Sequence, residues 1–192
     1  ALVFGGVVAL IYYFVIMGGG VPNINLTPQD FANEDPFDQI NPQDANAWRN
    51  SGKGCELSVI NALQTKWYRY FYDALDDWDK GYPDTLTLHP IFNNNPGAVG
   101  HETECVTVNA KVKVCNGDYG NTRWKGINEV LIDSQGHIIA SAARMNEYYL
   151  GDEDDDQMQY TMCHELGHAW GLGHTDETFG NADLGDCMDY TN

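Results

Sequence analysis

Three histidines and one glutamate near the C-terminus have the spacing of a metal site. They lie in the stretch HELGHAWGLGH, from His164 to His174, which fits the pattern H-E-x-x-H-x-x-G-x-x-H. Residues four apart share one face of an α-helix, so His164 and His168 can direct both imidazoles at one point. Two neutral imidazoles at that spacing suit Zn²⁺. Glu165 lies about 100° around the helix from His164, where a general base would act on a zinc-bound water.

The second half of this stretch completes the set of ligands. A straight helix cannot bring His174 back to a metal held by His164 and His168, so the chain must turn. Gly171 can take the left-handed conformation that ends a helix and reverses its direction. His174 then becomes the third protein ligand, and the fourth position stays open, as in catalytic zinc sites. The short motif H-E-x-x-H also occurs by chance, but the added glycine and histidine favour the metal interpretation.

With these residues the sequence resembles the metzincin zinc proteases, whose extended motif this is. Met188, in the run Cys187-Met188-Asp189-Tyr190, resembles the methionine turn that lies beneath the metal in that clan. The resemblance is specific over about the last thirty residues and covers the preceding hundred only in outline. It implies an α+β fold with a twisted, mostly parallel sheet and an antiparallel edge strand. A packing helix over residues 65–80 and a zinc helix at about 155–171 complete this architecture.

Tyr190 is a second candidate catalytic residue. It lies two residues after Met188, the spacing at which the tyrosine of astacin-like and serralysin-like metzincins can reach the zinc. Matrixins generally lack this tyrosine. By this resemblance Tyr190 would be a fifth zinc ligand that, once released, donates a hydrogen bond to the oxyanion. The alternative is a tyrosine packed beneath the site with its hydroxyl on a backbone carbonyl.

The N-terminal residues differ in composition from the rest of the chain. Residues 1–21 contain no charged side chain, and their apolar run approaches the roughly 20 residues that a membrane-spanning helix needs. We interpret them as a transmembrane signal-anchor, with a cleaved signal peptide or a buried core helix as alternatives. Five acidic residues follow before the first basic residue, Arg49. Because positive residues mark the cytoplasmic flank, we expect the catalytic domain outside the cell or in a lumen, anchored or secreted.

The remaining sequence divides into a linker and one domain. Residues 22–50 are rich in Asn, Asp, Gln and Pro and are expected to form a flexible stalk. Residues 51–192 are expected to form the zinc metalloprotease domain, cut short soon after Met188. The chain has 10 Lys and Arg against 28 Asp and Glu, a net charge of −18. This charge argues against nucleic acid and anionic lipid surfaces as partners, since both need a basic patch.

Hydrophobic spacing predicts the elements that must position the motif. Trp67, Phe71, Ala74, Leu75 and Trp78 recur at helical spacing and predict one apolar face of the helix over residues 65–80. Strands are expected at residues 55–62, 85–88, 105–115, 126–133 and 138–145.

The strand just upstream of the zinc helix is the candidate substrate strand. In metzincins this strand is the sheet edge on which a peptide substrate lies, and Ile138–Met145 resembles it. An exposed edge offers unpaired backbone groups, so it could bind an extended protein or peptide substrate irrespective of its sequence. An ordinary internal strand is the alternative.

Two other groups of residues bear on metal binding. Asp152–Asp156 is an acidic run just before the zinc helix, where the helix dipole favours acids. A Ca²⁺ site is the alternative, although the spacing does not match an EF-hand loop. His89, His101 and His137 follow no ligand spacing and are expected to be surface residues rather than a second zinc site. The expected cofactor is therefore one catalytic Zn²⁺.

Five cysteines in a chain that is expected to be exported predict two disulfides and one unpaired cysteine. Cys105 and Cys115 lie at the two ends of one alternating segment and could close a hairpin. In the metzincin architecture the segment before the first histidine ligand lies against the methionine turn. The resemblance therefore implies a Cys163–Cys187 bridge and leaves Cys55 free.

The predicted function is the hydrolysis of internal peptide bonds in proteins outside the cell. Glu165 would take a proton from a zinc-bound water and pass it to the leaving amine. An inactive zinc-binding module is one alternative, but it would be expected to lose the base, and Glu165 is present. A membrane-tethered structural or adhesive protein is the other, and it would bind no stoichiometric zinc.

Overall fold

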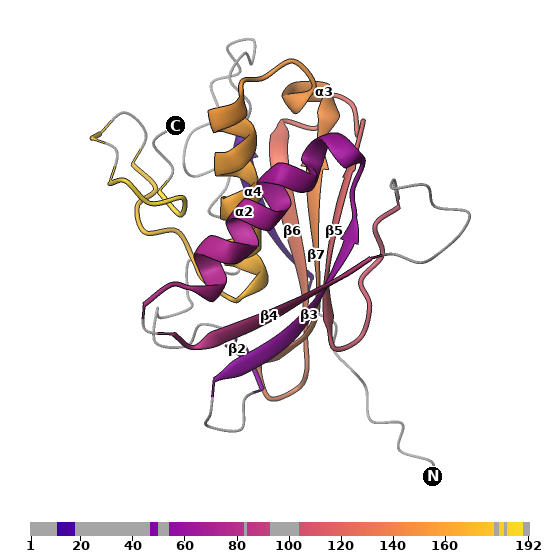
Figure 1. Ribbon diagram of the computed structural model, residues 1–192, viewed down its shortest axis with the longest axis vertical. Coiled ribbons are helices and arrows are strands. Elements are labelled where there is room, and N and C mark those ends of the chain that lie inside the picture. Colours follow the sequence, from indigo (N-terminus) through magenta and orange to yellow (C-terminus); the bar gives the residue numbers. More distant parts are fainter. Residues whose placement is uncertain are drawn as a thin grey trace.

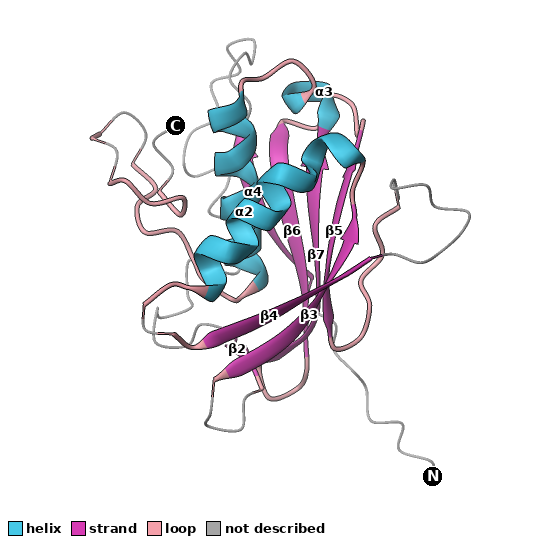
Figure 2. Cartoon of the chain, in the orientation of Figure 1, coloured by secondary structure: helices cyan, strands magenta, loops and turns pink. Residues whose placement is uncertain are grey.

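Strands from along the chain form one seven-stranded sheet, and the two longer helices cross one face of it (Figure 1; Figure 2). The computed structural model describes residues 54–82, 84–92 and 104–178, together with the short ranges 47–49, 181–182 and 184–189. Of residues 11–17 it describes the backbone. The fold is α+β with a mostly parallel sheet, as the sequence predicts.

The first half of the described chain forms a strand–helix–strand unit. Strand β3 (Cys55–Ala62) is followed by a 3₁₀ turn η3 (Thr65–Trp67), helix α2 (Tyr68–Asp79) and strand β4 (Leu86–Phe92). Strands β3 and β4 are parallel, and α2 makes the crossover between them. The helix buries the face that its spacing predicts: Trp67, Phe71, Ala74 and Leu75 are in the core, and Trp78 packs against it.

The second half adds the strands on which the histidine motif rests. These are β5 (Lys111–Gly117), β6 (Trp124–Ile132) and β7 (His137–Asn146), followed by the short helix α3 (Glu147–Leu150) and helix α4 (Asp155–Ala169). With strand β1 (Ile11–Met17), the strand order is β1-β6-β7-β5-β3-β4, and the seventh strand, β2 (Ala47–Trp48), pairs with β7. Strands β5 and β7 continue the parallel part of the sheet, whereas β6 runs antiparallel to β7. Helix α4 packs across β6 and β7 and against α2.

The prediction that the substrate strand Ile138–Met145 lies at the edge of the sheet is wrong. Ile138–Met145 lies within β7, which pairs with β5 on one side and β6 on the other, so it is an internal strand. Strand β6 runs antiparallel to β7, but it is not an edge either, because its outer side pairs with strand β1 (Ile11–Met17). The error arose because both strands alternate in the same way, and an alternating pattern does not show which strand lies at the edge.

The N-terminal apolar run contributes a strand. Residues 11–17, predicted as part of a membrane helix, pair antiparallel with β6 from Ile11 opposite Leu131 to Met17 opposite Trp124. β-branched and aromatic residues dominate the sequence IYYFVIM, and they favour strands as well as apolar helices. Within the described residues, no helix is both long and apolar enough to cross a membrane. The rest of the segment 1–21 lies outside the described residues.

Strand β2 (Ala47–Trp48) joins the sheet from within the predicted stalk. It pairs parallel with the first residues of β7, and Trp48 is buried. The indole Nε1 of Trp48 donates a hydrogen bond to the carbonyl of Ala169, the last residue of α4, at 2.8 Å. Residues 47 and 48 therefore belong to the folded domain and hold the end of the histidine helix.

Both predicted disulfides are present. Cys105 bonds to Cys115, Cys163 bonds to Cys187, and Cys55 is free. Cys105 and Cys115 do not close a hairpin, because only residues from Lys111 onward form a strand and Cys105 lies in the preceding loop. The bridge instead fastens that loop to the buried strand β5.

Candidate metal centre

Helix α4 carries the first two histidines, and acidic residues begin it. Asp154 is the N-cap, and its side chain accepts a hydrogen bond from the backbone N–H of Gln157 at 2.9 Å. Asp155 and Asp156 lie in the first turn, where the helix dipole favours negative charge. Much of the acidic run 152–156 therefore acts as a helix start, as its position predicts.

The turn that follows the helix returns the chain to the site. Gly171 has φ 97°, the left-handed conformation expected at this position. The backbone N–H of Gly171 donates to the carbonyl of His168, and that of Leu172 donates to Gly167. These two bonds close the helix end and direct the next residues towards His164.

The three histidines converge on one point. The Nε2 atoms of His164 and His168 are 2.9 Å apart, and those of His164 and His174 are 3.2 Å apart. Three nitrogens bound tetrahedrally to zinc at roughly 2.0–2.1 Å would be about 3.3 Å from one another. His164 and His168 are fully buried, and His174 is partly exposed. Among the described residues, this is the one group of three or more histidine, cysteine or acidic side chains that could hold a metal ion.

The second nitrogen of each ring is held by an acceptor. Nδ1 of His164 faces the backbone carbonyl of Cys187, and Nδ1 of His168 faces that of Leu172 at 2.8 Å. Nδ1 of His174 lies 3.0 Å from a carboxylate oxygen of Glu177. A proton on each Nδ1 leaves each Nε2 with a lone pair directed at the common point. This is how metal-binding histidines are oriented in proteins.

Burial also sets the charge of these rings. Burial, followed by the nearby His174, lowers the pKa of His164 to about 3. Burial likewise lowers the pKa of His168 well below its ordinary value, with the neighbouring histidines adding to the shift. Both rings are therefore neutral at pH 7, the form that binds a metal. The donor set, its tautomers and its charge all fit a zinc ion.

Glu165 is fully buried, and neither of its carboxylate oxygens has a hydrogen-bond partner among the described residues. Burial raises the pKa of Glu165 well above its ordinary value. A buried carboxylate without partners is costly, so it points to a ligand or water that completes the site. Glu165 is not a member of the group of side chains that could hold a metal ion, which consists of His164, His168 and His174.

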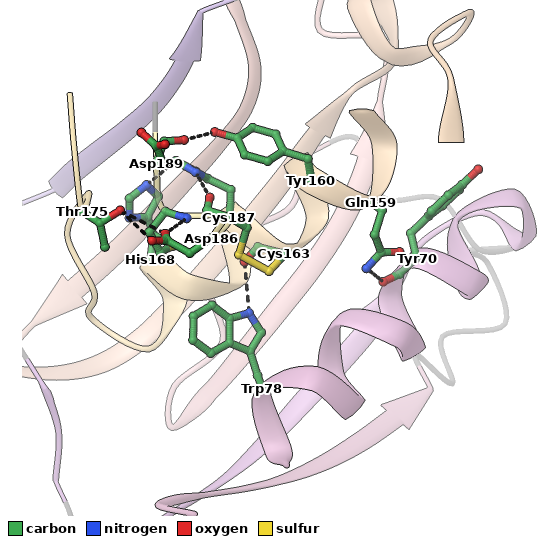
Figure 3. Close-up of a disulfide and its surroundings, with 12 residues drawn as sticks. Tyr70, Trp78, Gln159, Tyr160, Cys163, His168, Thr175, Asp186, Cys187 and Asp189 are labelled. Carbon is green, nitrogen blue, oxygen red and sulfur yellow. Dashed lines mark hydrogen bonds between the residues drawn. A yellow bond between two sulfur atoms is a disulfide. The ribbon is translucent and has the colours of Figure 1, made fainter. Parts of the chain in front are cut away.

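The segment of residues 186–189 packs against helix α4 (Figure 3). A Cβ at Gly167 would lie only 2.1 Å from the sulfur of Met188, so this glycine lets the methionine pack directly against α4. The Cys163–Cys187 disulfide joins the helix to the same segment. The indole of Trp78 donates to the Cys163 carbonyl at 3.1 Å, and the hydroxyl of Tyr160 donates to the Asp189 carbonyl. Met188 therefore packs against helix α4, as the resemblance implies for the segment that contains it.

The other residues singled out by the sequence lie elsewhere or outside the described part. Tyr190 and His101 are outside the described residues. His89 pairs with Glu56 at the surface, and His137 lies near Asp133. Sequence reasoning missed Glu177 as the partner of His174, because a carboxylate three residues away has no recognisable signal in an otherwise acidic chain.

A comparison of the sequence with models of known protein families finds no match, and a comparison with curated proteins finds no significant relative. The function therefore has to be inferred from the residues and their geometry.

Proposed function

We propose that this protein is a zinc-dependent endopeptidase of the metzincin type. One observation carries the proposal: three imidazole Nε2 atoms converge while each Nδ1 is occupied by an acceptor, and the adjacent Glu165 is buried with no hydrogen-bond partner among the described residues. Three protein nitrogens leave one position of a tetrahedral ion open, which is the arrangement of a catalytic zinc. A structural site would be expected to supply a fourth ligand.

Bound zinc would supply Lewis-acid chemistry, polarising the scissile carbonyl and lowering the pKa of water. His164, His168 and His174 would hold it. Glu165 accepts a proton from the attacking water and passes it to the leaving amine. Because Glu165 is fully buried, bulk water cannot exchange with the proton that it carries.

The peptide substrate is expected on the outer side of β6 rather than on β7. β6 packs against α4, as β7 does, and it lies next to the proposed base, since Gly126 of β6 is in close contact with Glu165. An extended peptide would pair with its backbone. That side of β6 is paired with β1, so a substrate strand would have to replace β1.

The two disulfides support a location in an oxidising compartment. A secreted protein and one anchored through residues 1–21 both fit this, with the catalytic domain outside the cell or in a lumen. The acidic net charge continues to argue against nucleic-acid substrates.

Cleavage of an unstructured protein by the full chain, with mass spectrometry of the products, tests the proposal. We expect internal cleavage that a chelator abolishes and added zinc restores. Glu165→Ala should keep one zinc per chain while hydrolysis falls by about 10²–10⁴-fold. His168→Ala should lose the metal and the activity together.

The same measurements separate the alternatives. Stoichiometric zinc without cleavage, in the wild type and in Glu165→Ala alike, would indicate a zinc-binding module. Absence of stoichiometric zinc in the wild type would mean that the motif is incidental. Activity retained by the Glu165 variant would remove Glu165 from the mechanism.

A further inference from the structure

Strand β6 approaches the helix at the position of Glu165. A Cβ added to Gly126 would lie 2.5 Å from Oε1 and 2.7 Å from Cγ of Glu165, closer than any ordinary contact. It would also lie 2.8 Å from Cγ2 of Thr161. Any side chain at position 126 would therefore move the glutamate or the helix. The Glu165 carboxylate can occupy this position only because residue 126 has no side chain.

Two residues further along the same strand, Asn128 holds the backbone of the same glutamate. Its Nδ2 donates to the carbonyl of Glu165 at 2.9 Å, and its Oδ1 accepts from the hydroxyl of Ser141 on β7 at 2.9 Å. Asn128 and Ser141 are fully buried. Residues two apart on a strand share one face, so Gly126 and Asn128 both face α4.

We propose that Gly126 and Asn128 are positioning residues for Glu165, with Gly126 setting the place of the carboxylate and Asn128 that of the main chain. This rests on the proposed role of Glu165 as base. Neither carboxylate oxygen has a hydrogen-bond partner among the described residues, so packing fixes the side chain. Gly126 makes the closest approach to it. Asn128 fastens that turn of α4 to two strands at once.

A double-mutant cycle tests the contact without using activity. Gly126→Ala is made in the wild type and in Glu165→Ala, and thermal unfolding of the zinc-loaded proteins is compared. We expect a clear fall in Tm in the wild-type background and a much smaller fall when the glutamate is absent. Equal falls in both backgrounds would mean that Gly126 accommodates Thr161 or the strand, and would overturn its assignment. This result does not depend on whether the protein is a peptidase.

Kinetics then test positioning. In Gly126→Ala, displacement of the base should lower kcat by about 10²-fold with little change in KM. Asn128→Leu should lower kcat in the same way, by about tenfold, while zinc stays bound. Asn61→Leu is the matched control, because Asn61 is an equally buried asparagine on β3 that accepts a hydrogen bond from Leu63 away from Glu165.

The control variant Asn61→Leu should have a lower free energy of unfolding and an unchanged kcat. An unchanged kcat in both Gly126→Ala and Asn128→Leu, with active wild-type protein, would overturn the proposal. So would equal losses of kcat in Asn61→Leu and Asn128→Leu. An inactive wild type would instead refute the proposed function, and the unfolding cycle would still decide the contact between Gly126 and Glu165.

Discussion

Among single residues of the centre, Glu165 is the most unfavourable to bury, whereas the buried histidines are hydrogen-bonded. Glu165 lies in the core without a hydrogen bond from the described residues, and two neutral histidines lie beside it. An unpaired buried polar group costs about 1–3 kcal/mol. A fold retains such groups where function requires them, and zinc, water and a peptide would supply what the protein does not.

Tyr190 is the residue whose catalytic role depends most on the resemblance. Its neighbour Asp189 is held near α4 by the hydroxyl of Tyr160. If Tyr190 donates to the oxyanion, Tyr190→Phe should lower kcat with little change in KM, because that contact exists mainly in the transition state. Loss of one such donor costs about 2.7–4 kcal/mol elsewhere. Steady-state kinetics decide this, and an unchanged kcat would return Tyr190 to a packing role.

At the scale of elements, three segments far apart in the sequence meet at the histidine helix. β6 lies against its base-bearing face, the Met188 segment lies beneath it, and Trp48 from β2 holds its last carbonyl. Strand β1 covers the outer side of β6. Two of these connections can be removed separately: the Cys163–Cys187 disulfide by substitution and strand β1 by deletion.

The Cys163–Cys187 bridge should stabilise both the fold and the metal centre. It closes a loop with a sequence separation of 24, for which chain entropy predicts about 3 kcal/mol. The carbonyl of Cys187 also accepts from His164, so opening the bridge should weaken zinc binding. Replacing both cysteines by alanine should therefore lower the free energy of unfolding and the zinc affinity.

The other disulfide provides the control for this prediction. Replacing Cys105 and Cys115 by alanine should also lower the free energy of unfolding, but it should leave zinc affinity unchanged, because that bridge lies in a separate cluster with Ala62 and Ala142. Denaturant unfolding and competitive zinc titration measure the two quantities. Equal loss of zinc affinity in both double variants would contradict the specific role of Cys187.

Removal of β1 should favour long substrates. Deleting residues 1–17 frees the outer side of β6, so kcat/KM for an extended peptide of eight or more residues should rise. The single substitution Phe14→Pro, which removes a donor within the strand, should act in the same direction. Zinc content verifies that the site remains intact. An unchanged kcat/KM in both proteins would show that β1 does not compete with substrate.

At the scale of the whole molecule, the sequence predicts the elements better than their arrangement. The periodic residues of α2 and the motif of α4 have strong local signals, and both helices form at about the predicted bounds. The order of strands depends on long-range pairing, so β7 could not be recognised as internal. The apolar residues 11–17 are compatible with a helix and with a strand, and they form a strand because they pair with β6.

The candidate centre was predictable to a similar degree. The candidate ligands and the turn at Gly171 follow from residue spacing. The packing of Met188 against α4 follows from the resemblance. The groups that hold these residues come from distant parts of the chain, such as Asn128, and spacing within one segment carries no information on them. Their role depends on which strand lies under the helix, and that is decided by tertiary packing.

Zinc K-edge X-ray absorption on the zinc-loaded chain identifies the atoms that bind the metal, because the spectrum depends on the type and distance of the donor atoms. If the three histidines form the proposed zinc centre, we expect one zinc per chain with three imidazole nitrogens at roughly 2.0–2.1 Å, one additional light ligand and no sulfur. His168→Ala should abolish this spectrum, and Glu165→Ala should leave its nitrogen shell unchanged. A shell containing sulfur at roughly 2.3 Å, or a wild type that binds no stoichiometric zinc, would contradict the assignment of His164, His168 and His174 as the metal centre.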